Sequence, residues 1–119
     1  MALKLNDFKD RIIEKTLNDD APSLIHGDLW SGNFLFDKDG RPVLIDPAIY
    51  FGNREAEFGM ITLFGGFNSD FFKGYFKERP LKDGWEERVK IYQLYHLLNH
   101  LNLMGDSYYN SITNLVRSL

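Results

Sequence analysis

The sequence predicts a small α+β domain that is mainly α-helical. One observation is the segment from Trp85 to Met104, a long run in which apolar residues recur at helical spacing. A second is the presence of shorter helical patterns before and after it. A third is a pair of short apolar runs around Asp37-Lys38-Asp39-Gly40, which is typical of a β-hairpin. With 119 residues, surface-to-volume scaling favours one modest domain spanning residues 1–119.

The amino-terminal segment is expected to form an amphipathic helix. Asn6 is available as its amino-terminal cap, and we expect the helix to end around Asn18, before residues 19–22. The apolar residues that recur near helical spacing are Leu5, Phe8, Ile12 and Leu17.

Short extended segments are predicted next. Leu24 and Ile25 lead into a loop, and residues 33–36 and 42–45 flank the turn at Asp37 to Gly40. The second strand of this hairpin should return the chain towards Asn33.

Four further helices are predicted, over residues 54–64, 70–76, 85–104 and 108–119. Gly65-Gly66 separates the first two. The long helix should be the main pillar of the core, and Gly105 is placed for a left-handed carboxyl-terminal cap. The last helix should pack on the same core. The expected apolar face of the long helix consists of Trp85, Val89, Tyr92, Leu94, Tyr95, Leu98, Leu101 and Leu103.

Composition argues against several classes of protein. A net charge of −3 offers no clustered basic face for nucleic acid. The absence of Cys excludes disulfides and thiolate zinc sites and suits a reducing compartment. The start of the sequence has no secretory pattern, and no apolar run is long enough to span a bilayer. We therefore expect a cytoplasmic protein with no nucleic-acid partner and no membrane partner.

The most informative motif runs from His26 to Asn33. A loop of the form H-x-D-x-x-x-x-N puts an aspartate near an attacking hydroxyl and an asparagine near a metal ion, and Asp28 and Asn33 have that spacing. Another oxygen ligand is needed to hold magnesium against nucleotide phosphates, and Asp46 is placed to supply it. The motif predicts a phosphoryl-transfer centre in which Asp28 is the catalytic base or orients the hydroxyl, while Asn33 and Asp46 bind metal.

Four stretches carry a family resemblance: residues 26–33, 45–48, 54–67 and 97–103. Together they resemble the fructosamine kinase (ketosamine 3-kinase) family, which is itself similar to the aminoglycoside phosphotransferases and to protein kinases. The resemblance extends from about Ser23 to about Tyr109.

This resemblance implies the carboxyl-terminal, catalytic lobe of a protein-kinase-like fold. It also implies that the complete enzyme uses ATP and Mg²⁺ to phosphorylate the 3-hydroxyl of a ketosamine, free or protein-linked, such as a fructosamine or ribulosamine adduct. The family's amino-terminal nucleotide lobe has no counterpart before His26, since neither a G-x-G-x-x-G loop nor its strand lysine is found there. We therefore expect little or no turnover from this chain alone, which would need that lobe or another chain supplying it, and we expect a tendency to self-associate.

Further residues have supporting roles in this interpretation. His26 is expected to brace the loop and not to carry protons. Glu57 resembles an acidic residue that anchors the catalytic loop in related phosphotransferases, the alternative being an acidic first helical turn favoured by the helix dipole. For Trp30, packing under the loop and lining the ketosamine pocket have equal weight.

Other patterns have simpler interpretations. His96 and His100 could face one metal ion from one helix, but no third ligand accompanies them, so buried or interfacial hydrogen bonding is favoured. The Asp37 to Gly40 sequence lacks the spacing of a calcium loop and is taken as a turn. A set of aromatic residues is expected in the core, with part of it able to face another subunit or the missing lobe: Phe58, Phe64, Phe67, Phe71, Phe72, Tyr75 and Phe76.

Two alternative functions stay open. The acceptor could be an aminoglycoside, choline or homoserine, although Leu29-Trp30-Ser31 and Asn99-His100 argue against that. The chain could instead be a non-catalytic interaction module or remnant lobe that docks on another chain.

Overall fold

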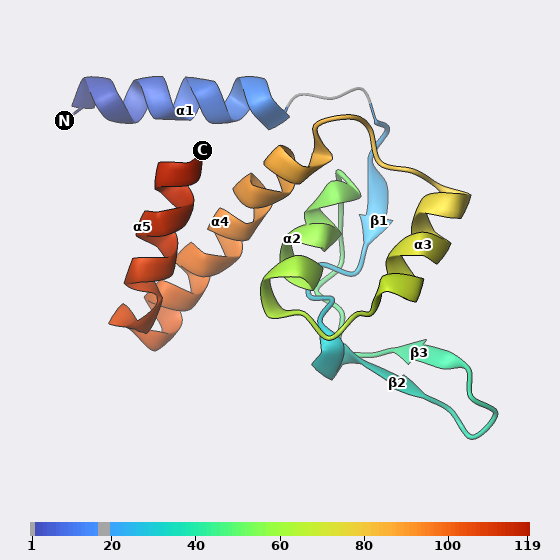
Figure 1. The fold of residues 1–119 in the computed structure, drawn as a ribbon. Helices are drawn as coiled ribbons and strands as arrows, with labels where there is room; N and C mark the ends of the chain where they lie inside the picture. Colours follow the sequence, from blue (N-terminus) through green and yellow to red (C-terminus); the bar gives the residue numbers. More distant parts are fainter. Residues whose placement is uncertain (1, 17–19) are drawn as a thin grey trace.

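The computed structural model describes residues 2–16 and 20–119 as a mainly helical α+β fold (Figure 1). This confirms the fold class predicted from the sequence. The elements in chain order are α1 (Ala2–Thr16), β1 (Ser23–Ile25), η1 (Ser31–Asn33), β2 (Phe34–Phe36), β3 (Pro42–Leu44), β4 (Tyr50–Gly52), α2 (Glu55–Phe64), α3 (Ser69–Glu78), α4 (Trp85–Met104), η2 (Asp106–Tyr108) and α5 (Tyr109–Ser118).

The strands form two antiparallel pairs. The predicted hairpin is confirmed: β2 pairs with β3, with Phe34 opposite Leu44. Its turn closes where the Gly40 amide donates to the Asp37 carbonyl at 3.0 Å. The second pair, β1 with β4, places Leu24 opposite Phe51 and was not predicted. In Figure 1 the β2–β3 hairpin projects away from the helices.

The core lies where α2 packs against α4. The helices approach closely at Gly59, because a Cβ atom there would lie 2.8 Å from the Cβ of Tyr92. Phe58 is 1% exposed, and its ring is surrounded by aromatic rings from α3 and the start of α4. The core position predicted for Phe58 is thus confirmed, whereas Phe72, Tyr75 and Phe76 are half-buried against it. Phe64, the last residue of α2, is 37% exposed and lies outside the core, contrary to the prediction. The other buried apolar residues of these two helices are Ala56, Met60, Ile61, Val89, Ile91, Leu94 and Leu97.

A buried ion pair joins α2 to α4. The Glu55 carboxylate is fully buried and accepts two hydrogen bonds of 2.7 Å from the Arg88 guanidinium. Arg88 also donates to the carbonyls of Lys82 and Asp83 in the loop before α4. Arg54 similarly donates to the carbonyls of Arg79 and Pro80. Charged hydrogen bonds therefore fix the start of α2.

The terminal helices pack on the outer side of α4. In Figure 1, α5 runs beside α4 and α1 lies across their ends. Arg11 and Lys15 of α1 both donate to the main-chain oxygen of Leu119 at 2.9 Å. Among the residues whose burial is described, neither terminal helix contains a fully buried one.

Three details differ from the sequence prediction. Helix α1 begins at Ala2, so Asn6 lies inside it and is not its cap, while the predicted end near Asn18 and the position of Leu17 lie outside the described residues. Gly105 has φ 83° but ψ −163°, so it ends α4 with a positive φ and not in the left-handed helical conformation. On α4, Tyr95, Leu98 and Leu103 are exposed.

The α4 discrepancy has a physical reason. Helix α4 packs against α2, and its buried residues include Ile91 and Leu97, which the predicted apolar face did not contain. An apolar pattern that extends almost all round a helix does not show which side the neighbouring helix covers.

Within the described part of the chain, no helix combines the length and apolar character needed to cross a membrane.

Candidate active site

The candidate site is built on the loop from His26 to Asn33, which links β1 to β2. Gly27 has φ +84°, and a Cβ atom at this position would lie only 2.0 Å from the Ala48 carbonyl oxygen. Only glycine combines this backbone conformation with so close an approach. The loop can therefore pack directly against the segment that follows Asp46.

Hydrogen bonds hold these two segments together. The Ala48 amide donates to the His26 carbonyl at 2.8 Å. The His26 ring accepts from the Asp28 amide through Nδ1 at 3.2 Å, so its Nε2 carries the proton that contacts the Ile45 carbonyl at 2.8 Å. Since each ring nitrogen is hydrogen-bonded to a main-chain group, His26 lies where it can brace the loop.

Glu57 reaches the same loop from α2. Its Oε1 accepts a 2.7 Å hydrogen bond from the Gly27 amide. Its Oε2 is buried and makes no hydrogen bond within the described residues. Burial raises the pKa of Glu57 from its usual value, although the hydrogen bond from Gly27 and the nearby His26 act in the opposite direction. The charged form of Glu57 is thus held against the loop although burial disfavours it.

Asp28 and Asn33 are in direct contact. The Asn33 amide group donates to the Asp28 carbonyl at 2.8 Å and to the Asp28 carboxylate at 3.1 Å. Asn33 is only 6% exposed, and both interactions use its Nδ2. The Asn33 Oδ1 accepts no hydrogen bond within the described residues and is the atom that could bind a cation.

Asp46 follows a residue of the hairpin that is bonded to Asn33. The Ile45 amide donates to the Asn33 carbonyl at 2.9 Å, which places the next residue, Asp46, at the same end of the hairpin. Asp46 has φ 50°, a left-handed conformation that is uncommon outside glycine. Its side chain is exposed and makes no hydrogen bond or ion pair within the described part of the chain. This carboxylate is therefore available to a ligand.

The donor set suits a hard cation only in part. An amide oxygen and one or two carboxylates are oxygen ligands of the kind that Mg²⁺ uses. No group of three His, Cys, Asp or Glu side chains able to hold a metal ion occurs among the described residues. Mg²⁺ commonly completes its coordination with water and substrate phosphates, and these residues fit that mode.

A pocket of about 530 Å³ opens beside Asp28. Asp28 and Trp30 contribute to one side of it, and residues of α4 contribute to another. Trp30 is 40% exposed, and its ring covers Gly32, where a Cβ atom would lie 2.3 Å from the ring. Trp30 thus both packs over the loop and lines the pocket.

The α4 side of this pocket was missed from the sequence. Tyr95, His96, Asn99 and His100 all line it. Their recurrence on the predicted helix at spacings of three and four residues was the available signal. The His100 ring also contacts the His96 carbonyl through Nδ1 at 2.7 Å, which agrees with the hydrogen-bonding interpretation for His100 but leaves it untested for the His96 ring.

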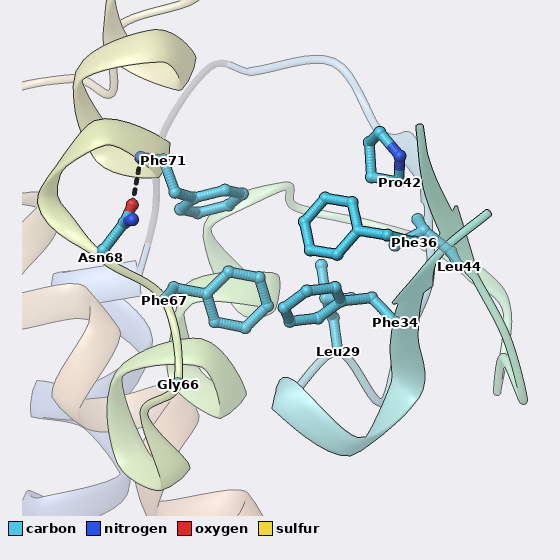
Figure 2. Close-up of a pocket in the computed structure, with 9 residues that line it drawn as sticks. All are labelled: Leu29, Phe34, Phe36, Pro42, Leu44, Gly66, Phe67, Asn68 and Phe71. Carbon is cyan, nitrogen blue, oxygen red and sulfur yellow. Dashed lines mark hydrogen bonds between the residues drawn. The ribbon is translucent and has the colours of Figure 1, made fainter. Parts of the chain in front are cut away.

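A second, larger pocket of about 810 Å³ is apolar and lies between the hairpin and the start of α3 (Figure 2). Phe34 and Phe36 approach it from β2, opposite Phe67 and Phe71. The Phe34 and Phe67 rings are in contact, with centroids 5.1 Å apart. The Asn68 side chain accepts from the Phe71 amide at 3.1 Å and so caps α3. Leu29 lines this apolar pocket, whereas its neighbours Asp28 and Trp30 line the 530 Å³ pocket, which includes polar groups.

The comparisons with known proteins identify the family. A family model described as fructosamine kinase matches residues 4–119. The chain therefore belongs to the fructosamine kinase family. It is 46% identical over 112 residues, or 93% of its length, to a protein of Enterococcus faecium named probable ketoamine kinase. It is 48% identical over 95 residues, or 80% of its length, to the chloroplastic protein-ribulosamine 3-kinase of Arabidopsis thaliana.

A solved structure extends the match to the fold. The crystal structure of a candidate fructosamine-3-kinase from Thermobifida fusca matches with a TM-score of 0.83 and 36% identity, over 94% of this chain and 39% of that chain. The chain spans 40% of the E. faecium relative and 29% of the Arabidopsis relative. The matched region is thus less than half of each of these proteins.

Proposed function

We propose that this chain carries the catalytic part of an ATP-dependent ketosamine kinase. The observation that carries the proposal is the contact between Asp28 and Asn33, with Asp46 held at the same end of the hairpin and a 530 Å³ pocket beside Asp28. Phosphoryl transfer depends mainly on positioning and on charge stabilisation, and this arrangement supplies groups for both.

Each residue has a role in this proposal. Asp28 accepts a hydrogen bond from the acceptor hydroxyl, the 3-hydroxyl of a fructosamine or ribulosamine, and orients it for in-line attack. Asn33, through Oδ1, and Asp46 hold Mg²⁺, which neutralises charge on the phosphates of bound ATP. Glu57 and His26 fix the loop that carries Asp28. Trp30 lines the sugar-binding side of the pocket.

In the same proposal, the chain is the carboxyl-terminal lobe of a protein-kinase-like fold. The nucleotide-binding lobe lies outside these 119 residues and is supplied by another segment or another chain. We therefore expect little or no transfer from the 119 residues alone, because the groups that clamp the ATP phosphates are not among the residues assigned here.

A hybrid protein tests this function. The segment of the E. faecium relative that aligns with this chain is replaced by the chain. Phosphorus NMR then follows sugar phosphate formation from Mg·ATP with two ketosamines, fructosyl-lysine and ribulosyl-lysine. We expect transfer in the hybrid and a loss of about a thousandfold or more in Asp28→Asn. A folded, ATP-binding hybrid without transfer, or with equal transfer in Asp28→Asn, would contradict the proposal.

The same hybrid separates the alternative acceptors. A panel with an aminoglycoside, choline and homoserine should give no product above the ketosamine signal. Transfer to one of them in preference to both ketosamines would replace the proposed substrate class and keep the phosphoryl-transfer chemistry.

A further inference from the structure

The wall between two cavities is formed in part by His96. The pocket of Asp28 and a smaller cavity of about 400 Å³ share four lining residues, namely Gly27, Ala48, Tyr95 and His96. His96 is 9% exposed, and it is the buried titratable residue among these four. It therefore lines both cavities, together with Gly27 of the loop that carries Asp28.

The His96 ring has no hydrogen-bond partner within the described residues. Its main-chain carbonyl accepts from His100, but neither ring nitrogen makes a hydrogen bond within the described part of the chain. The two nitrogens are not among the fully enclosed side-chain atoms that lack a partner, so they keep access to water or a ligand. Because His96 lines the pocket, the space from which such a partner can come is the pocket itself.

The surroundings keep this ring uncharged. Burial lowers the pKa of His96, the carboxylate of Asp28 acts in the opposite direction, and His100 lowers it further. A neutral imidazole has one nitrogen that donates and one that accepts. A sugar hydroxyl also donates and accepts, so it is a suitable partner at either nitrogen.

We propose that His96 is a substrate-positioning residue that hydrogen-bonds a hydroxyl of the ketosamine in the pocket beside Asp28. This inference rests on the proposed function and specifies how its acceptor is held. Asp28 contacts the hydroxyl that reacts, and His96 binds a different one, so that the sugar is oriented from two sides. A histidine that only fills the core would be indifferent to the sugar.

Binding of fructosyl-lysine to the unaltered chain, without nucleotide, tests the inference. Long-range ¹H–¹⁵N spectra report the ring nitrogens of His26, His96 and His100 separately. We expect the His96 nitrogen signals to shift with increasing ligand, while those of His26, which are used by the backbone, stay in place. Absence of any shift at His96 with bound ligand, or absence of ligand binding, would overturn the inference.

Two variants separate positioning from packing. His96→Phe fills the same space without polar atoms and should weaken fructosyl-lysine binding about tenfold, whereas His96→Asn should restore part of the loss. Thermal melting establishes that each variant is folded. In the hybrid protein, His96→Phe should raise KM for the ketosamine and leave KM for ATP unchanged. Equal ligand affinity in the folded His96→Phe chain would overturn the inference, while the transfer function is judged separately by Asp28→Asn.

Discussion

The α2–α4 core and the strands of this molecule differ in how far their apolar side chains are exposed to solvent. In the core, Phe58 is 1% exposed, and the one buried carboxylate joining the helices is paired with Arg88. On the strands, Phe51 of β4 is 74% exposed, and Leu24 of β1 and Phe36 of β2 are also exposed. The helices thus hold the chain together, whereas the strands present apolar surface.

The candidate site lies at the boundary between these regions. The loop is tied to the core by the contact of Gly27 with Glu57, while Asp46 is exposed on the other side. A site of this kind has one fixed side and one side open to a ligand or to further protein. Substitutions in the two regions should accordingly have unequal effects.

The largest effect is expected at the buried ion pair. Arg88→Ala leaves the Glu55 carboxylate buried without its partner and should lower the free energy of unfolding by about 3–5 kcal/mol. The matched change Arg41→Ala, in the exposed ion pairs of the hairpin turn, should cost less than about 1 kcal/mol. Urea unfolding measures both. Equal losses would show that the core and hairpin do not differ as described.

A second test compares two glycines with positive φ. Gly27→Ala should lower the free energy of unfolding by about 2–3 kcal/mol, because it adds steric overlap with the Ala48 carbonyl to the cost of the backbone conformation. Gly40 in the hairpin turn also has a positive φ, +77°, but the space around its Cβ position is open. Gly40→Ala should therefore lower the free energy of unfolding by only about 1 kcal/mol. Thermal or urea unfolding decides the order; a larger loss at Gly40 would contradict the packing described for the loop.

The third test uses the pH dependence of stability to measure how far burial of the Glu57 carboxylate beside the loop lowers the free energy of unfolding. Because its pKa is raised in the folded chain, the unfolded chain gives up this proton more readily, and stability falls as the pH rises past the folded pKa. Glu57→Gln keeps an acceptor for the Gly27 amide and should remove this pH dependence without loss of stability at pH 7. Glu57→Ala should cost about 1 kcal/mol. Unfolding curves from pH 4 to pH 8 would show these differences, and a Gln variant less stable than the Ala variant would refute the explanation.

The smallest effect concerns His96. Its pKa is lowered from the usual value near 6.5, so the unfolded chain binds the proton more readily than the folded chain does. Its contribution is therefore complete above about pH 6.5 and is lost as the pH falls towards the folded pKa. Replacing His96 by Asn should flatten the stability profile between pH 5 and pH 7. An unchanged slope would mean that burial does not lower the pKa of this ring in the folded chain.

Much of the fold follows from local pattern. Helix α4 has the predicted bounds, Trp85–Met104, because a long amphipathic run ended by Gly105 is a strong signal. The hairpin was predicted because the turn at Asp37 to Gly40 has turn chemistry of its own. The pairing of β1 with β4 was not, since strands of three residues have too little periodicity to show which partner they take.

The site was predictable to a similar degree. The spacing within the loop motif identified Asp28 and Asn33 as candidate residues, and the predicted hairpin identified Asp46. The place of His96 in the wall of the pocket and the ion pair of Arg88 with Glu55 were missed, because these contacts join segments far apart in the sequence. Helical periodicity locates a residue on its helix, but only tertiary packing determines whether that side meets a pocket or a buried carboxylate.

The central claim is that Asn33 and Asp46 bind a metal ion beside Asp28. The most direct measurement is amide broadening in ¹H–¹⁵N spectra of the chain as Mn²⁺, an oxygen-preferring paramagnetic ion, is added in the presence of ADP. We predict broadening centred on Asn33 and Asp46, lost in Asp46→Asn and retained in the control Asp39→Asn. Broadening centred on the turn at Asp37 to Gly40, or unaffected by Asp46→Asn, would contradict the account.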